Sequence, residues 1–166
     1  ILENSAGISE NNPPFRRTYP SGGANYPLEM YLFIMNSEDR IKEGLYHYDV
    51  LDNKLELIRG TKNIEELRNS VGTAQIEKSS VFVVLTANME RTTDEYGDRG
   101  YRYIHIEAGH LMQNICLTSE AIGLSALPYG GINEDKLNHM IDIRNEETIY
   151  TALIGKGGEE FREKQH

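Results

Sequence analysis

With 166 residues, 39% of them hydrophobic and 26% charged, the chain has the size and composition of one globular domain. Its formal net charge of −9 argues against nucleic acids and anionic membrane surfaces as partners. The single cysteine, Cys116, excludes an internal disulfide framework and multi-cysteine zinc sites, and no apolar run approaches the roughly 20 residues of a membrane span, so we expect a cytoplasmic protein.

The first residues look like the end of a helix. Ile1 to Ala6 lead into Gly7, a residue that commonly follows a helix C-terminus, and residues 9–14 are rich in the Asn and Pro of a polar connection. We therefore interpret residues 1–20 as a helix remnant plus a connection. Residues 1–166 then form a single domain that lacks its N-terminal helix.

Strands and one helix are predicted over the first half of the chain. Residues 28–35 (LEMYLFIM) are a continuous apolar run, which is typical of a buried strand. Residues 44–50 and 54–58 predict a β-hairpin, and residues 63–71 a short amphipathic helix. Residues 80–87 (SVFVVLTA), β-branched and apolar, give the strongest strand signal in the sequence.

A long helix dominates the second half. Over residues 101–122, small and apolar side chains recur at helical spacing before the stop at Gly123: Ile104, Ala108, Leu111, Met112, Ile115, Ser119 and Ile122. A short helix over residues 134–141, with Asn133 as its N-cap, and a strand over residues 148–154 follow. This order predicts an α+β fold in which helices cover a mixed sheet, with the long helix at its centre.

The histidines and possible nucleophiles suggest no metal site and no hydrolase. His105 and His110 are five residues apart, about 140° around a helix, whereas a zinc helix spaces two histidines by four. We expect His110 to be a packed or hydrogen-bonded helix residue. The sequence around Ser125 lacks the second glycine of a nucleophile elbow, and Cys116 on an apolar helix face is expected to be an inert core thiol.

Two glycine pairs remain as candidate ligand loops. Gly22-Gly23 precedes the first buried strand, and Gly130-Gly131 lies between the long helix and the next one. Each pair removes Cβ atoms and exposes backbone N–H groups. With Pro20, Pro128 and Tyr129 as apolar walls, such loops suit a planar heteroaromatic ring with polar edges. Both pairs are also compatible with ordinary turns, and spacing alone favours that simpler interpretation.

Four segments resemble the SagB-type dehydrogenase branch of the nitroreductase superfamily: residues 20–31 (PSGGANYPLEMY), 44–58, 94–131 (with YRYIHIEAGH and the late GG loop) and 147–155. The resemblance implies a nitroreductase-like α+β domain with a mixed, mostly antiparallel sheet, and the 101–122 helix in the core of a homodimer. It also implies an FMN cofactor bound at the subunit interface, in contact with both chains.

The same resemblance assigns roles to both glycine loops. Pro20, Ser21, Gly22 and Gly23 would lie near the flavin ring and ribityl chain, with the glycines allowing close backbone approach. The loop formed by Pro128, Tyr129, Gly130 and Gly131 would bring backbone amides to the N5 and O4 edge of the flavin. Donors there would stabilise the negative charge that follows reduction.

The phosphate-binding part of the family pattern differs in this chain. The family usually opens with an arginine-rich segment that holds the FMN phosphate, and Arg16 and Arg17 do not stand at that place. Lys156 and Arg162, after the last strand, are candidate phosphate ligands, because related proteins use basic residues there. A solvated acidic tail is the alternative interpretation of the same segment.

A second difference concerns the reaction. Members of this branch that oxidise azolines to azoles carry a Lys-Tyr pair where this chain has Glu95-Tyr96. Tyr96 is the candidate catalytic residue, as a proton donor or acceptor near the flavin, or else a packed loop aromatic. The sequence therefore favours an FMN-dependent oxidoreductase that passes hydride from NADH or NADPH to a small-molecule electron acceptor. The alternative is a flavin-poor, non-catalytic scaffold or partner subunit of a peptide-modifying complex.

Overall fold

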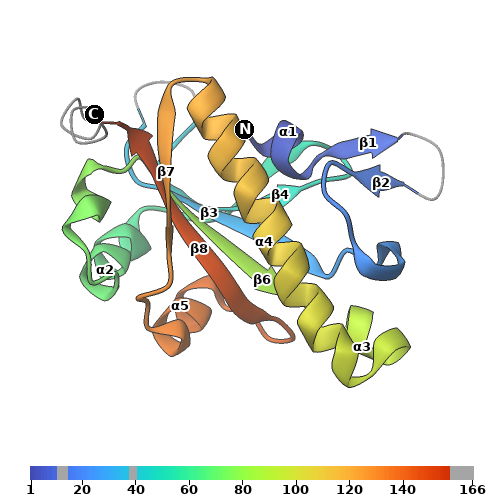
Figure 1. Ribbon diagram of the computed structural model, residues 1–166. Helices are drawn as coiled ribbons and strands as arrows, with labels where there is room; N and C mark the ends of the chain where they lie inside the picture. The colour runs from blue at the N-terminus through green and yellow to red at the C-terminus, as the bar shows by residue number, and fades with distance from the viewer. Residues whose placement is uncertain (11–14, 38–40, 158–166) are drawn as a thin grey trace, which may run out of the picture.

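A six-stranded sheet organises the computed structural model, which describes residues 1–10, 15–37 and 41–157 (Figure 1). The strand order is β5-β4-β3-β6-β8-β7, and each of these neighbouring pairs is antiparallel. The strands are β3 (Leu28–Ile34), β4 (Gly44–Asp49), β5 (Lys54–Arg59), β6 (Val81–Ala87), β7 (Leu124–Tyr129) and β8 (Glu147–Lys156). The α+β class is confirmed, and this sheet is fully antiparallel rather than mixed.

The apolar runs of β3 and β6 form the middle of the sheet. The two strands pair along their whole length, with Leu32 opposite Val83. Because side chains alternate along a strand, Met30 and Leu32 face one core cluster while Phe33 faces the other. Burial on both faces explains why these runs are continuously apolar instead of alternating.

Helices cover both faces of the sheet (Figure 1). One face packs against α1 (Leu2–Ala6) and the long α4 (Asp98–Ala121). The other packs against α2 (Lys62–Ser70), the 3₁₀ segment η2 (Ala74–Lys78) and α5 (Glu134–Ile141). Two hydrophobic cores result, one on each side of the sheet.

The buried stripe predicted for the long helix is confirmed, apart from its last member. Ile104, Ala108, Leu111, Met112, Ile115 and Ser119 are buried on α4. Ile122, one residue beyond the helix, is 60% exposed. Cys116 is half-buried rather than a core thiol, and burial raises its pKa, which disfavours the reactive thiolate.

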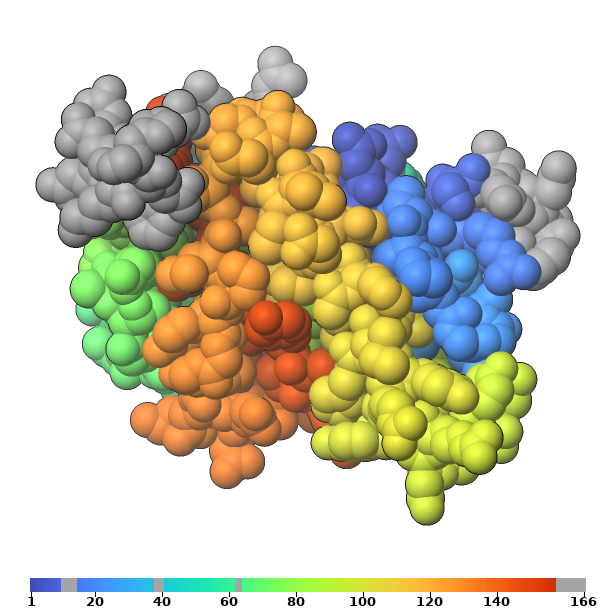
Figure 2. Space-filling model, viewed as in Figure 1, coloured from blue at the N-terminus to red at the C-terminus, as the bar shows by residue number. Residues whose placement is uncertain are grey.

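The opposite side of α4 carries the exposed apolar side chains Ile106 and Leu117, and Tyr101 is exposed near the N-terminal end of the helix. In the space-filling view α4 forms a ridge between the N-terminal segment and β7 (Figure 2). A helix with apolar side chains on two sides typically packs against a second surface in addition to its own sheet.

Three elements differ from the sequence-based expectation. The helix α3 (Glu90–Tyr96) precedes α4, where we expected a loop, and β7 occupies residues interpreted as part of a loop. Pro128 is compatible with β7 because this strand is at the edge of the sheet. The expected N-terminal connection contains a small two-stranded sheet of β1 (Ile8–Glu10) and β2 (Arg16–Arg17).

Within the described residues, none of the helices combines the length and apolarity that crossing a bilayer requires.

A charged cluster lies on β3 and β4. The Glu29 carboxylate accepts hydrogen bonds from His47 Nε2 at 3.0 Å and from Arg91 Nη1 at 2.7 Å. The hydrogen bond to Glu29 raises the pKa of His47. Burial alone would raise the pKa of Glu29, but the hydrogen bonds from His47 and Arg91 prevail and lower it.

These shifts predict a bell-shaped contribution to stability. The lowered pKa of Glu29 means that its contribution is present above its unfolded value of about 4.5 and is lost in acid. The raised pKa of His47 means that its contribution is full below its unfolded value of about 6.5 and disappears as the pH rises. We therefore expect Glu29→Gln to lower the melting temperature most between about pH 4.5 and 6.5.

Melting curves of the parent and the variant at about pH 3.5, 5.5 and 8.5, which lie below, between and above those pKa values, check this expectation. Glu66→Gln, an exposed carboxylate on α2, is the matched control and should show no such maximum. If Glu29→Gln lowered the melting temperature equally at all three pH values, the result would contradict the charge coupling and indicate a packing effect.

Candidate functional site

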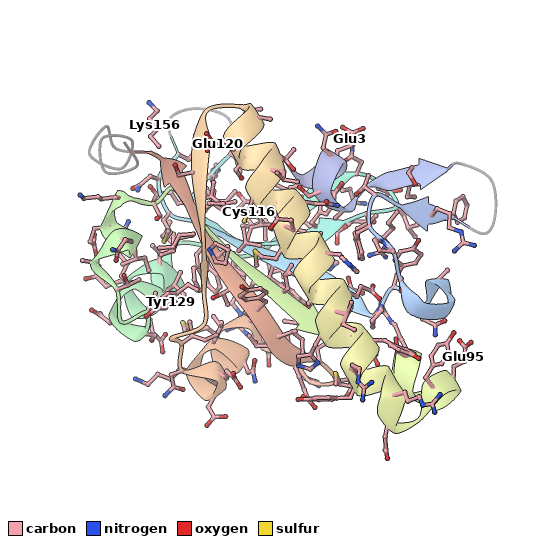
Figure 3. All side chains as sticks on the ribbon, in the orientation of Figure 1. Glu3, Glu95, Cys116, Glu120, Tyr129 and Lys156 are labelled. Atoms are coloured by element: carbon pink, nitrogen blue, oxygen red, sulfur yellow. The ribbon has the colours of Figure 1, made fainter. Side chains whose placement is uncertain are left out.

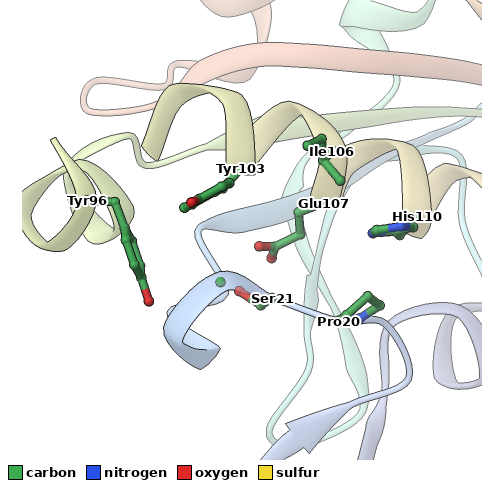
Figure 4. Close-up of a pocket in the computed structure, with 8 residues that line it drawn as sticks. Pro20, Ser21, Tyr96, Tyr103, Ile106, Glu107 and His110 are labelled. Atoms are coloured by element: carbon green, nitrogen blue, oxygen red, sulfur yellow. The ribbon is translucent and has the colours of Figure 1, made fainter. Parts of the chain in front are cut away.

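A pocket of about 390 Å³ opens between the loop before the 3₁₀ turn η1 (Gly22–Ala24) and the first half of α4 (Figure 4). The lining is largely aromatic and polar: Pro20, Ser21, Gly22, Tyr96, Tyr103, Ile106, Glu107 and His110. A shallower hollow of about 270 Å³ between α1 and α4 is lined by Asn4, Asn114, Leu117 and Thr118 and lacks titratable side chains. The first pocket is therefore the candidate site.

The Ser21 side chain fixes the shape of the loop on one side of the pocket. The side-chain hydroxyl oxygen accepts a hydrogen bond from the backbone N–H of Tyr26 at 2.9 Å. The backbone carbonyl of Ser21 accepts one from the N–H of Ala24 at 3.1 Å. Gly23, Ala24 and Tyr26 have φ values of 62°, 59° and 44°, in the left-handed region. Two of these residues are not glycine, so the loop stores backbone strain beside the pocket.

The two adjacent glycines of this loop have different roles. A Cβ on Gly22 would have the Tyr103 side chain as its nearest neighbour, at 3.5 Å, which is ordinary contact. A Cβ on Gly23 would lie 2.6 Å from Glu95 Oε2 and 2.9 Å from the Tyr96 hydroxyl. Gly23 therefore serves the packing of the loop against α3, while Gly22 leaves bare backbone on the pocket wall.

Tyr96 reaches the pocket from the end of α3. A Cβ on Gly100 would lie 2.9 Å from the Thr93 backbone, so this glycine lets α3 pack tightly against α4. The Tyr96 and Tyr103 rings then meet edge to face, with centroids 5.2 Å apart. A hydrogen bond to Glu95 raises the pKa of Tyr96, so its phenol keeps its proton at neutral pH.

Glu95 also ties α3 to the pocket loop. Its Oε2 accepts a hydrogen bond from Asn25 Nδ2 at 2.9 Å, and this bond lowers the pKa of the carboxyl. Glu95 is thus a charged group beside the pocket.

Sequence reasoning missed Glu107. It is 2% exposed, lines the pocket, and neither carboxyl oxygen has a hydrogen-bond partner among the described residues. Burial raises its pKa to about 7, although the neighbouring Ser21 hydroxyl and the Arg17 charge counteract part of that effect. The available signal was a carboxylate beside Ala108 within the buried stripe of α4, three residues after Ile104.

Arg17 is a cation behind the pocket. Its Nη1 donates to the Tyr19 hydroxyl at 3.0 Å and to the Leu28 carbonyl at 3.5 Å, and its guanidinium lies 4.8 Å from the centroid of the Tyr26 ring. Burial raises the pKa of Tyr19 to about 12, so Tyr19 is an uncharged phenol. Arg17 therefore supports the loop instead of pointing into the pocket, whose lining contains neither Lys nor Arg.

The other predicted site residues lie apart from this pocket. Pro128 and Tyr129 belong to β7 and, like Gly130 and Gly131, are not among the lining residues. Gly131 does not need a left-handed φ, and a Cβ there would meet the Tyr129 hydroxyl at 2.7 Å. The role of these four residues in binding stays a prediction, but one chain does not bring them to the Pro20–Gly23 loop.

Lys156 is not among the residues that line the pocket either. It ends β8 opposite Leu124, near the C-terminal end of α4, whereas Glu95 lies at the opposite end of the molecule (Figure 3). Arg162 lies outside the described residues.

The histidines of α4 take different positions. His105 Nδ1 lies 2.8 Å from the Tyr101 carbonyl oxygen, whereas His110 is exposed on the pocket wall. The expectation that His110 is packed or hydrogen-bonded within the helix is therefore wrong, because position 110 is off the buried stripe.

Comparison with known proteins identifies the family. The sequence profile of the Nitroreductase family matches residues 1–156. The chain belongs to the nitroreductase family. Among its relatives, MJ1384 of Methanocaldococcus jannaschii, named as a nitroreductase, is 32% identical over 133 residues, which cover 77% of this chain and 65% of the relative. The Microcin B17-processing protein McbC of Escherichia coli is 34% identical over 145 residues, or 84% of this chain and 53% of McbC.

Solved structures of other nitroreductase-family proteins share the fold. A nitroreductase-like protein of Anabaena variabilis superposes with a TM-score of 0.85 at 25% identity, over 92% of this chain and 33% of that one. A chain of the E. coli microcin synthetase McbBCD complex with truncated pro-MccB17 superposes with a TM-score of 0.83 at 25% identity, over 95% of this chain and 62% of the matched chain. This nitroreductase-family chain thus spans between one third and two thirds of the length of these relatives.

The contrast between the two loop glycines is testable in this nitroreductase-family chain. Gly23→Ala forces a left-handed alanine against Glu95 and should lower the free energy of unfolding by about 1–2 kcal/mol. Gly22→Ala has room and an ordinary φ, so stability should stay the same or rise by up to about 1 kcal/mol. Urea unfolding of both variants measures their free energies of unfolding. An equal decrease in the two variants would contradict the different roles of Gly22 and Gly23.

Proposed function

We propose that this chain is an FMN-dependent oxidoreductase of the SagB-type branch, which moves hydride between NADH or NADPH and a small-molecule electron acceptor. The observation that carries the proposal is the pocket itself: the bare backbone of Ser21 and Gly22 faces aromatic rings and a buried acid across a space of about 390 Å³. Membership of the nitroreductase family supports the same conclusion. One solved neighbour, an oxidoreductase containing FMN, shares the fold at a TM-score of 0.60.

The pocket fits the uncharged part of FMN. Tyr96, Tyr103 and Ile106 offer apolar and aromatic surface, while the Ser21 hydroxyl and the Glu107 carboxyl offer polar contacts. The lining lacks cations, so the phosphate requires basic groups from elsewhere. Lys156 and Arg162 are the candidates that the sequence offers.

We infer that a second copy of the chain completes the site. The Pro20–Gly23 loop and the Pro128–Gly131 loop do not line the same pocket within one chain, and α4 exposes Ile106 and Leu117 on its outer side. A homodimer packed through α4 would cover these side chains. It would also let one FMN touch the first loop of one protomer and the second loop or Lys156 of its partner.

Each pocket residue has a defined task in this proposal. FMN, when bound, would supply the hydride chemistry. The Ser21 hydroxyl and the backbone of Gly22 would orient the ligand, and the Tyr103 ring would exclude water from one side. Tyr96, whose raised pKa keeps the phenol protonated, would hold a proton near the reacting atoms.

A partner subunit in a peptide-modifying complex is the second candidate function. McbC, at 34% identity, is named as a processing protein of microcin B17, and a matching chain belongs to the McbBCD complex. Glu95, in place of the lysine of azoline oxidisers, argues against azole formation because its charge is opposite. In this alternative the fold is retained for association and FMN binds weakly or not at all.

Titration with FMN distinguishes the two functions. We expect the purified chain to quench FMN fluorescence at micromolar protein and to oxidise NADH or NADPH once FMN is added. Tyr96→Phe should leave FMN affinity unchanged and reduce turnover about 100-fold, the lower end of the range for a proton-transfer residue. Asp94→Asn, an exposed carboxylate on α3, is the control. Absence of FMN binding in the dimeric protein would favour the partner-subunit function.

The dimer has its own test. Leu117→Glu puts a charge on the exposed apolar side of α4 and should convert a dimer into a monomer in light scattering, with a loss of FMN affinity of at least tenfold. Leu51→Glu, a 73% exposed residue of the β4–β5 hairpin, should change neither. A parent chain that is monomeric at micromolar concentration would contradict the shared site.

A further inference from the structure

Glu107 is a buried acid whose hydrogen-bonding capacity is unused. Its side chain points from α4 toward Ser21 across the pocket (Figure 4). The residue is 2% exposed, and neither carboxyl oxygen has a partner among the described residues. A buried polar group without a partner costs stability, so its presence in a pocket wall points to a ligand that pairs with it.

The groups that surround Glu107 leave it one free direction. Behind the loop, the Arg17 guanidinium donates hydrogen bonds to the Tyr19 hydroxyl and to the Leu28 carbonyl. The Ser21 hydroxyl accepts the Tyr26 N–H and keeps its own proton, which it can donate to only one of the two carboxyl oxygens of Glu107. Tyr103 and His110, on α4 itself, and Tyr96, from α3, are the other titratable groups that line the pocket. The remaining side of the carboxyl faces the pocket space.

The environment favours the protonated acid. Burial is the main reason why the pKa of Glu107 rises to about 7, so protonated and ionised forms coexist near neutral pH. A ligand that fills the pocket replaces the water beyond the buried carboxyl with a less polar surrounding and disfavours the charge further. An uncharged carboxylic acid can donate a hydrogen bond, which a carboxylate cannot.

We propose that Glu107 is a second proton-holding residue of the pocket, which donates a hydrogen bond from its protonated carboxyl to a carbonyl oxygen or imine nitrogen of the bound ligand. This inference rests on the proposed function only in taking FMN, which carries both kinds of acceptor, as the probe. Glu107 thereby selects uncharged acceptor atoms and rejects ligands that place an anionic group at this point. Binding above the pKa of the free carboxyl takes up one proton.

The first experiment measures FMN affinity against pH. For the parent chain, the dissociation constant should be flat below about pH 7 and should rise toward tenfold per pH unit above it, since one proton is taken up. Glu107→Gln keeps the shape and a permanent donor, so its affinity should match the low-pH parent value and should not follow this trend. Glu120→Gln, the same change at an exposed site on α4, should behave like the parent.

The second experiment needs no ligand. A carboxyl whose pKa is about 7 in the folded chain and about 4.5 when unfolded stabilises the fold in acid and loses that contribution as the pH rises through 7. The melting temperature of Glu107→Gln relative to the parent should therefore increase between about pH 5 and pH 8. Glu120→Gln should show no such increase.

The outcomes separate this inference from the proposed function. FMN binding with the same pH dependence in the parent and in Glu107→Gln overturns the role of Glu107 and leaves the flavoenzyme intact. Absence of FMN binding at every pH overturns the flavoenzyme and the donated hydrogen bond, while the melting series still decides whether Glu107 holds a proton. A Glu107→Gln variant that is destabilised equally at every pH overturns the proton-holding role.

Discussion

The packing of α4 against the sheet is the interaction on which the rest of the structure depends. The stripe from Ile104 to Ser119 fixes the rotation of the helix about its own axis, because these side chains must face β3, β6 and β8. That rotation buries Glu107 at the edge of the stripe and turns Ile106 and Leu117 outward. The acid of the pocket and the apolar outer surface are thus two results of one packing arrangement.

How far the sequence determines the fold in advance depends on how strong each local signal is. β3 and β6 could be predicted because their apolar runs are long, and α4 because its period persists over six turns. The helix α3 could not, since its residues are mostly polar and its position comes from close contact at Gly100. The strand β7 contains a proline and is formed by pairing with β8, a partner distant in sequence.

The candidate site was predictable only in part for the same reason. Pro20, Ser21, Gly22 and Tyr96 line one pocket, while their contact with a flavin stays a prediction. The motif could not distinguish Gly22, which faces the pocket, from Gly23, which faces Glu95. Nor could it reveal Glu107, whose significance comes from burial without a partner. Spacing identifies backbone features well, but the desolvation of a single carboxyl becomes visible only in three dimensions.

The hydrogen bond between Asn25 and Glu95 has a consequence for which side chain position 95 can carry. The bond joins a donor on the pocket loop to an acceptor on α3. A lysine at position 95 has only donors, so it would face the amide nitrogen of Asn25 without an acceptor unless that amide turned over or became a carboxylate. Glutamate at position 95 thus holds the pocket loop to α3 through one amide–carboxylate hydrogen bond, and a lysine there would keep that link only by accepting nothing and donating to a turned Asn25 amide.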